Sequence, residues 1–170
     1  MSKSNYLQEE QDSDIVLDIF IRTNSGGTPL SFSDLLMSIA TANWSKYDSR
    51  KEIKDVIDKV RENGNFEIDK DFVLKTCLVL LIDNIKFQVK NFTQENVRLF
   101  EDNWERIKKC IISAFKLFKR LGFDNRSFRA TRAAIPVIYY IFYNSLEDSI
   151  YKSTYNKDDQ KAIAKWLTLS

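Results

Sequence analysis

The apolar residues between positions 97 and 121 recur at alternating intervals of three and four, and this spacing constrains the fold more than any other feature of the sequence. Such spacing is typical of an amphipathic α-helix with one face turned toward other apolar surfaces. Thr93 is a common N-cap residue and Gly122 a common helix stop, so the sequence predicts one long helix over about residues 94–121. The stripe consists of Val97, Phe100, Trp104, Ile107, Ile111, Ala114, Phe118 and Leu121.

Two packing arrangements are compatible with a stripe of this kind. Two copies of the chain can pair along it as a coiled coil, which makes a helical homo-oligomer one of the hypotheses. The stripe also holds aromatic residues and alanine, which suit the irregular packing of a globular bundle better than the uniform seam of a coiled coil. We therefore expect the helix to pack inside its own chain.

The rest of the chain is predicted to be helical as well. Its 170 residues include four Gly and two Pro, too few for an all-β sandwich, which needs turn residues about every ten positions. Apolar residues make up 44% of the chain, enough for a buried core. We expect an all-α fold, an irregular bundle of about six helices that forms a single domain over residues 1–170. Besides the long helix, helices are expected near 13–22, from 31 onward, over 49–64, 71–83 and 133–144, and from 158 onward.

Capping residues indicate where two of these helices begin. Ser49 and Glu52 have the spacing of a capping box, in which the two side chains satisfy free N–H groups of the first turn. Asp69 is expected to cap the helix over 71–83. That helix is apolar nearly all round, which predicts a position at the centre of the bundle.

The residue types limit the chemistry that the chain can carry out. It has no histidine, which removes Ser-His-Asp and Cys-His catalysis and histidine-ligated metal sites. Cys77 and Cys110 lie far apart in apolar stretches and are expected to be core side chains in a reducing cytosol. The acids at 69–71 and 158–159 stand at predicted helix starts. In each group we expect one acid to cap the helix, so the acids need no catalytic role. We predict no catalytic residue, no metal site and no cofactor of its own for this chain.

The apolar runs are too short to cross a membrane. The longest, at 72–82 and 133–143, hold about eleven residues, whereas a membrane-spanning helix needs about twenty. The N-terminal residues lack the apolar centre of a signal peptide. The sequence therefore predicts a soluble, cytoplasmic chain without a membrane partner.

A glycine pair follows the first predicted helix, in the sequence Phe20-Ile21-Arg22-Thr23-Asn24-Ser25-Gly26-Gly27-Thr28-Pro29-Leu30-Ser31. The backbone N–H groups of such a turn can cradle a phosphate, with Arg22 adding positive charge. A tight turn between two helices requires the same residue types, and the spacing matches neither of the common phosphate-binding glycine motifs. A phosphate-binding nest and a plain helix connection both stay open.

Positive charge is concentrated between residues 116 and 132, where six cations accompany one acid, Asp124. The last three arginines are spaced by three, which favours a shared face, and phenylalanines lie between the cations. Such a patch binds nucleic-acid phosphates weakly and in a salt-dependent manner. A solvated helix end explains the same charges, and the acidic segment 9–18 can also neutralise them. The six cations are Lys116, Lys119, Arg120, Arg126, Arg129 and Arg132.

The Phe20–Ser31 sequence, with Asp34-Leu35-Leu36 and Trp44 after it, resembles a known family element. This is the F-x-R-x-N-x-G-G-x-x-L-S element of the GmrSD restriction-endonuclease N-terminal domain family, long catalogued as a domain of unknown function. The resemblance runs over almost the whole chain, and its most specific part is Arg22–Ser31. Further matching segments are Trp104, Leu121-Gly122-Phe123 and Ile135-Pro136-Val137-Ile138-Tyr139-Tyr140.

The resemblance implies a bacterial defence protein that senses modified phage DNA and couples recognition to NTP hydrolysis. In that family the NTPase site lies in a ParB/sulfiredoxin-like α/β subdomain with a D-G-Q-Q-R motif, often followed by a C-terminal nuclease half. The present sequence contains no D-G-Q-Q-R motif. We therefore expect the NTPase subdomain, upstream of this chain, and the nuclease half to be partners within a larger parent protein that uses NTP and Mg²⁺. The resemblance carries over Arg22, Asn24, Gly26 and Gly27 as the edge of a nucleotide-linked site.

Three hypotheses about function follow. The first is a non-catalytic helical module of a GmrSD-like, modification-dependent DNA-restriction protein, whose Arg22–Gly27 turn docks on the NTPase subdomain. The second is a stand-alone helical domain that binds nucleic acid or protein through the 116–132 basic stretch. The third is a structural homo-oligomer formed through the 97–121 stripe.

Overall fold

The computed structural model describes residues 32–82, 91–125 and 131–169. In these ranges the chain forms seven α-helices and one 3-10 helix, with no β-strand, which confirms the predicted all-α fold. The elements are α2 (Phe32–Asn43), α3 (Ser49–Glu62), α4 (Lys70–Leu81), α5 (Gln94–Asp102), α6 (Trp104–Arg120), η2 (Thr131–Ala133), α7 (Ala134–Tyr143) and α8 (Lys157–Leu169). The helix predicted over 13–22 lies outside the described residues.

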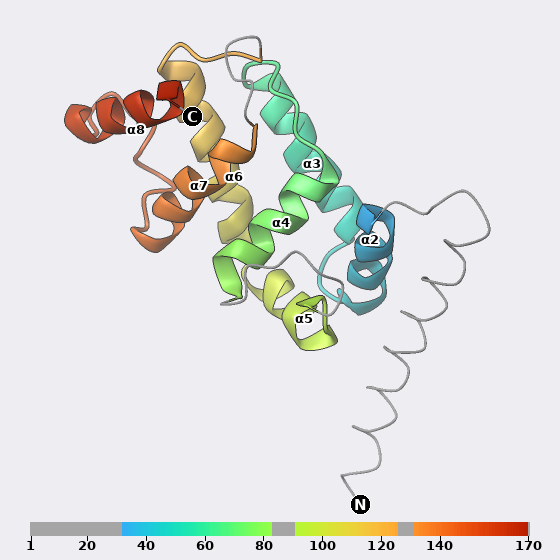
Figure 1. Cartoon of the computed structure of the whole chain (residues 1–170). Coiled ribbons are helices and arrows are strands. Elements are labelled where there is room, and N and C mark those ends of the chain that lie inside the picture. The colour runs from blue at the N-terminus through green and yellow to red at the C-terminus, as the bar shows by residue number, and fades with distance from the viewer. Residues whose placement is uncertain (1–31, 83–90, 126–130, 170) are drawn as a thin grey trace, which may run out of the picture.

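Helix α6 occupies the centre of the bundle. Helices α3 and α7 pack along it, and α5 leads into it (Figure 1). Helix α2 packs on α3, α4 and α5, whereas α8 lies at the other end of the molecule (Figure 1). None of the described helices is long and apolar enough to cross a membrane.

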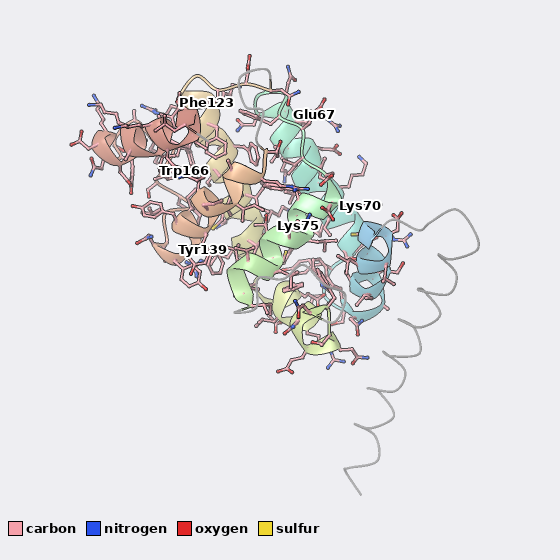
Figure 2. The ribbon with its side chains drawn as sticks, viewed as in Figure 1. Glu67, Lys70, Lys75, Phe123, Tyr139 and Trp166 are labelled. Atoms are coloured by element: carbon pink, nitrogen blue, oxygen red, sulfur yellow. The ribbon has the colours of Figure 1, made fainter. Side chains whose placement is uncertain are left out.

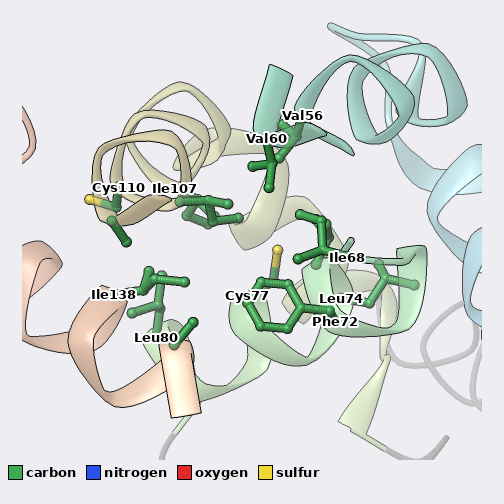
Figure 3. Close-up of a cluster of buried hydrophobic side chains, with 14 of the residues drawn as sticks. Val56, Val60, Ile68, Phe72, Leu74, Cys77, Leu80, Ile107, Cys110 and Ile138 are labelled. Carbon is green, nitrogen blue, oxygen red and sulfur yellow. The ribbon is translucent and has the colours of Figure 1, made fainter. Parts of the chain in front are cut away.

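One apolar core joins these helices. Figure 3 shows side chains from four of them meeting in one cluster, with Val60 of α3, Cys77 of α4, Ile107 of α6 and Ile138 of α7. Helix α4 is buried on nearly every side, as its sequence predicts. Aromatic rings add directional contacts, because they favour tilted and edge-on pairs over flat stacking.

The stripe of residues 97–121 is buried inside the chain. Val97, Ile107 and Phe118 have no exposed surface, the other stripe residues up to Ala114 are at most 1% exposed, and Leu121 at the end of the stripe is half-buried. Packing within one chain is therefore confirmed. The coiled-coil dimer through this stripe is wrong, because α3 and α7 already cover α6.

The prediction of one long helix over 94–121 is also wrong, because the helix breaks at Asn103. Asn103 leaves the helical region of the backbone, with φ −102° and ψ 5°, and its side-chain amide donates to the Leu99 carbonyl at 2.9 Å. Phe100 and Trp104 keep the helical spacing on either side of the break. An apolar pattern indicates which face of a helix is buried. The spacing of the apolar residues is the same with or without a local break, so it does not reveal the break.

A tertiary contact stabilises this break. The buried Glu101 carboxylate accepts hydrogen bonds from the backbone N–H groups of Ser45, Lys46 and Tyr47 at 2.8, 2.5 and 3.1 Å. Beside it, the Trp44 indole N–H donates to the Val97 carbonyl at 3.0 Å. These bonds join the α2–α3 connection to the α5–α6 junction over more than fifty residues of sequence.

Two helix starts differ from their prediction. Asp48, rather than Ser49, caps α3 and accepts from the N–H groups of Arg50 and Lys51. At α8 the capping bond goes to Asn156, which accepts from the N–H of Asp158 at 2.9 Å, so neither of the acids at 158–159 is the cap. In both cases the side chain that accepts from the free N–H groups lies one residue or more upstream of the predicted cap.

Other helix ends agree with their prediction. Asp69 caps α4 through the Phe72 N–H at 2.7 Å, and Thr93 caps α5. Gly122 ends α6 with a φ of +88°, and the Phe123 N–H reaches back to the Phe118 carbonyl at 3.0 Å. This pair of features is a Schellman motif, which needs a left-handed residue and therefore favours glycine.

Replacing Glu101 by Ala is expected to lower the free energy of unfolding by about 2 kcal/mol, because three backbone N–H groups lose their charged acceptor. Urea unfolding followed by circular dichroism measures the change. Glu62→Ala on the exposed end of α3 is the matched control and is expected to change stability by less than about 0.5 kcal/mol. Equal effects of the two substitutions would contradict the role given to Glu101.

Candidate functional site

A cleft of about 480 Å³ opens between the end of α3, the start of α4 and the η2–α7 segment. Both apolar and charged side chains line it. Figure 2 shows Glu67 and Lys75 on this side of the molecule, near α3 and α4. The lining residues are Arg61, Glu67, Ile68, Asp69, Asp71, Phe72, Lys75, Thr131, Arg132 and Ile135.

Several charges in the cleft have structural roles. The Asp69 carboxylate is the cap of α4, and Asp71 pairs with Lys75 at 2.6 Å one helical turn away. Arg61 contacts Asp58 only at 3.4 Å. Arg132 is exposed and forms no ion pair with any residue of the described ranges. The guanidinium groups of Arg61 and Arg132 are therefore the donors best placed to contact an anionic group entering the cleft.

The predicted basic stretch does not form one surface in the part of the chain that the structure describes. The Lys116 ammonium lies 4.9 Å from the centre of the Tyr151 ring, in the connection between α7 and α8. Arg132 instead faces α3 and α4 across the cleft. Lys119 and Arg120 are exposed in the last turn of α6. The remaining two cations, Arg126 and Arg129, lie outside the described residues.

The whole glycine element, Phe20–Ser31, lies outside the described residues, and the structure describes only the residues that follow it. Arg22, Asn24, Gly26 and Gly27 lie outside the described residues. Three residues that follow are core side chains, because Leu35, Leu36 and Trp44 have 7%, 0% and 8% of their surface exposed.

A polar cluster between α3 and α6 was not predicted. Glu52, which has the spacing of a capping residue, instead accepts from the Trp104 indole at 2.9 Å and from the Lys108 ammonium at 2.8 Å. Lys108 also pairs with Asp55 at 2.9 Å. Trp104 is fully buried and the other three residues are half-buried at the edge of the core, so the cluster cross-links α3 to α6.

Hydrogen bonds set the charge states in this cluster. The Lys108 hydrogen bond, with a contribution from Trp104, holds the pKa of Glu52 below its usual value despite partial burial. Lys59 and Lys108 lower the pKa of Asp55 in the same way. Burial opposes the charge on Lys108, but the bonds to the two carboxylates outweigh it and raise the pKa of Lys108. The cluster is ionised at neutral pH, which suits an ion-pair cross-link.

The two cysteines are buried side chains of the core, as predicted. Burial raises the pKa of the Cys77 thiol to about 12, and burial with the nearby Glu147 carboxylate does the same for Cys110. Neither thiol is a nucleophile at neutral pH. Among the described residues, no three His, Cys, Asp or Glu side chains are placed to hold a metal ion.

The chain matches no protein-family model, and a search of curated proteins found no match.

The cleft itself was not predicted from the sequence. Arg61 and Lys75 lie on two helices and Arg132 on a third element, and no motif connects them. The cleft is created when α3, α4 and α7 pack together, so the sequence alone does not reveal it. The one signal in the sequence was the positive charge around Arg132.

Replacing Glu52 by Gln is expected to destabilise the protein at pH 7 and to have progressively less effect in acid. The pKa of Glu52 is lowered in the folded state, so its contribution is present above the ordinary pKa of a glutamate side chain and is lost as the pH falls through the lowered pKa. Urea unfolding of both proteins from pH 7 down to about pH 3 measures the difference.

The control is Glu62→Gln, whose carboxylate is exposed on α3. It is expected to leave stability unchanged at each pH. A stability difference for Glu52→Gln that stays constant across this range would contradict the assigned pKa direction.

Proposed function

We propose that this chain is a non-catalytic helical module of a GmrSD-like, modification-dependent DNA-restriction protein. It would act with an NTPase subdomain that carries the D-G-Q-Q-R motif, a motif that the sequence does not contain. The observation that carries the proposal is the continuity between the Phe20–Ser31 element and α2, which begins at Phe32.

Helix α2 is anchored firmly in the bundle. Leu36 is completely buried, and Trp44 lies 5.1 Å from the Trp104 ring. Asp34 of α2 forms an ion pair with Lys70 at the start of α4, whereas Trp44 directly follows the end of α2. These contacts give the residues that follow the glycine element a rigid attachment. In the proposal, this attachment holds the chain next to Arg22–Gly27 while that turn docks on the NTPase subdomain.

The described ionisable groups support a scaffolding role. Glu52 and Glu101 are held in hydrogen-bonded contacts that join helices, and Asp69 caps a helix. A general acid or base needs a carboxylate that is close to substrate and able to exchange its proton. Carboxylates committed to structural bonds serve the packing of the bundle instead.

The purified chain is expected to hydrolyse neither ATP nor GTP in the presence of Mg²⁺. Release of inorganic phosphate, compared with a protein-free sample, measures the activity. Hydrolysis that is lost in Arg22→Ala but kept in Arg98→Ala, an exposed arginine on α5, would contradict the non-catalytic role.

A second candidate function is nucleic-acid binding through the basic stretch. The observation that favours it is the exposure of Lys119, Arg120 and Arg132, none of which forms an ion pair with a described residue. Cations that are not neutralised by neighbouring acids are available to phosphates. The opposing observation is their distribution, because Arg132 lines the cleft whereas Lys116 contacts Tyr151.

In this second candidate, duplex DNA binds weakly and its affinity falls steeply as salt is raised. Replacing Lys119, Arg120 and Arg132 together by Glu is expected to weaken binding at least about tenfold, as measured by fluorescence anisotropy. A control with the same charge change replaces Lys51, Arg98 and Lys109, which are exposed on α3, α5 and an earlier part of α6, by Glu. Equal affinity of the two variants would reject the basic stretch as the binding site.

A further inference from the structure

The cleft between α3, α4 and the η2–α7 segment has the size of a small-molecule site. Its volume of about 480 Å³ lies in the range of about 300–1,000 Å³ that is usual for ligand pockets, whereas the groove of about 170 Å³ between α7 and α8 lies below it. The apolar part of its wall comes from Ile135, which is half-buried, and from the edges of Ile68 and Phe72. The charged residues around this wall determine which ligand fits.

The charges that line the cleft balance each other. The cations and the acids are equal in number, so the lining has no net charge. A ligand with several charges of one sign, such as a polyphosphate, is therefore opposed by half of the charged residues. A ligand that carries one positive and one negative group matches them. The cations are Arg61, Lys75 and Arg132, and the acids are Glu67, Asp69 and Asp71.

Two of these charges have no partner in the chain. Asp69 caps α4, and Asp71 pairs with Lys75 at 2.6 Å. Glu67 and Arg132 differ from them, because both are exposed and neither side chain forms an ion pair or a hydrogen bond within the described ranges. Two opposite charges thus line one cleft without meeting each other. A ligand with a charged group at each end can lie between them and pair with both.

Further hydrogen-bond donors line the cleft. Thr131 precedes Arg132 in η2 and carries a hydroxyl group. Arg61, in the last turn of α3, contacts Asp58 only at 3.4 Å, so its guanidinium keeps donors for a ligand. A carboxylate suits these donors, because its two oxygens match the parallel N–H groups of a guanidinium.

The positive end of the ligand is assigned by the acid that has no partner. Glu67 lies in the connection between α3 and α4 (Figure 2). Its carboxylate accepts hydrogen bonds and donates none, so an ammonium group, which has three donors, is the matching partner. Ammonium, carboxylate and an apolar side chain are the three parts of an apolar amino acid.

We propose that this cleft binds a small zwitterion, namely an amino acid or a dipeptide with an apolar side chain. The ligand carboxylate accepts from Arg132 and Arg61, and its ammonium group donates to Glu67. Its side chain packs on Ile135. The proposal does not depend on the docking of Arg22–Gly27, so either can fail without the other.

Isothermal titration calorimetry with the full chain tests the proposal. The probes are L-leucine and leucyl-leucine, which differ in the separation of their two charges. At least one is expected to bind with a Kd of about 1 mM or tighter. The N-acetyl derivative of that probe lacks the ammonium charge, and its amide derivative lacks the carboxylate. Each derivative is expected to bind at least about tenfold more weakly.

Substitutions in the cleft are expected to remove one pairing at a time. Arg132→Ala should weaken the probe about tenfold but leave the affinity for the amide derivative unchanged, because that derivative has no carboxylate to lose. Glu67→Gln should weaken the probe and leave the N-acetyl derivative unchanged. Matched controls are Arg98→Ala and Glu95→Gln, both exposed on α5, which should leave all affinities unchanged. Urea unfolding establishes that each variant folds.

Three results would overturn the proposal. The first is that neither probe binds. The second is equal affinity for the probe and its two derivatives, or equal affinity of Arg132→Ala and its control for the probe. The third is tighter binding of ATP than of either probe, which would make the cleft a site for anions alone.

Discussion

The face of α6 from Trp104 to Phe118 is buried along its whole length, and the other helices of the bundle depend on packing against it. Helices α3 and α7 cover it along its length, and Phe66, in the connection after α3, packs its ring 5.2 Å from that of Phe115. Burial of this much apolar surface is the main favourable term available to the fold. The polar contacts of Glu52 and Glu101 then fix how α6 and α5 are oriented against the N-terminal helices.

The parts of the fold that the sequence predicts are those that depend on local pattern. Helical spacing found the buried faces of α4 and α6, and single side chains such as Asp69 and Gly122 marked helix ends that the structure confirms. The break at Asn103 escaped prediction because it is stabilised by Glu101, whose N–H partners are more than fifty residues away. Glu52 was assigned to a cap for the same reason, since its true partners, Trp104 and Lys108, are on another helix.

The candidate sites also combine features that are visible in the local sequence with features that arise only when the helices pack. The charge around Arg132 is visible in the sequence, but the cleft that it lines exists only once three elements have packed together. The apolar groove between Pro136, Val137 and Tyr140 of α7 and Ala162, Ile163 and Trp166 of α8 likewise exists only once these two helices have packed together.

Amide hydrogen exchange tests the central claim most directly. The chain is measured alone and mixed with a D-G-Q-Q-R subdomain from a GmrSD-family protein. Docking through the Phe20–Ser31 element predicts slower exchange at residues 20–31 and in the first turn of α2, with α8 unchanged. Identical exchange across 20–31 in the two samples would contradict the proposal that this chain supports such an NTPase subdomain.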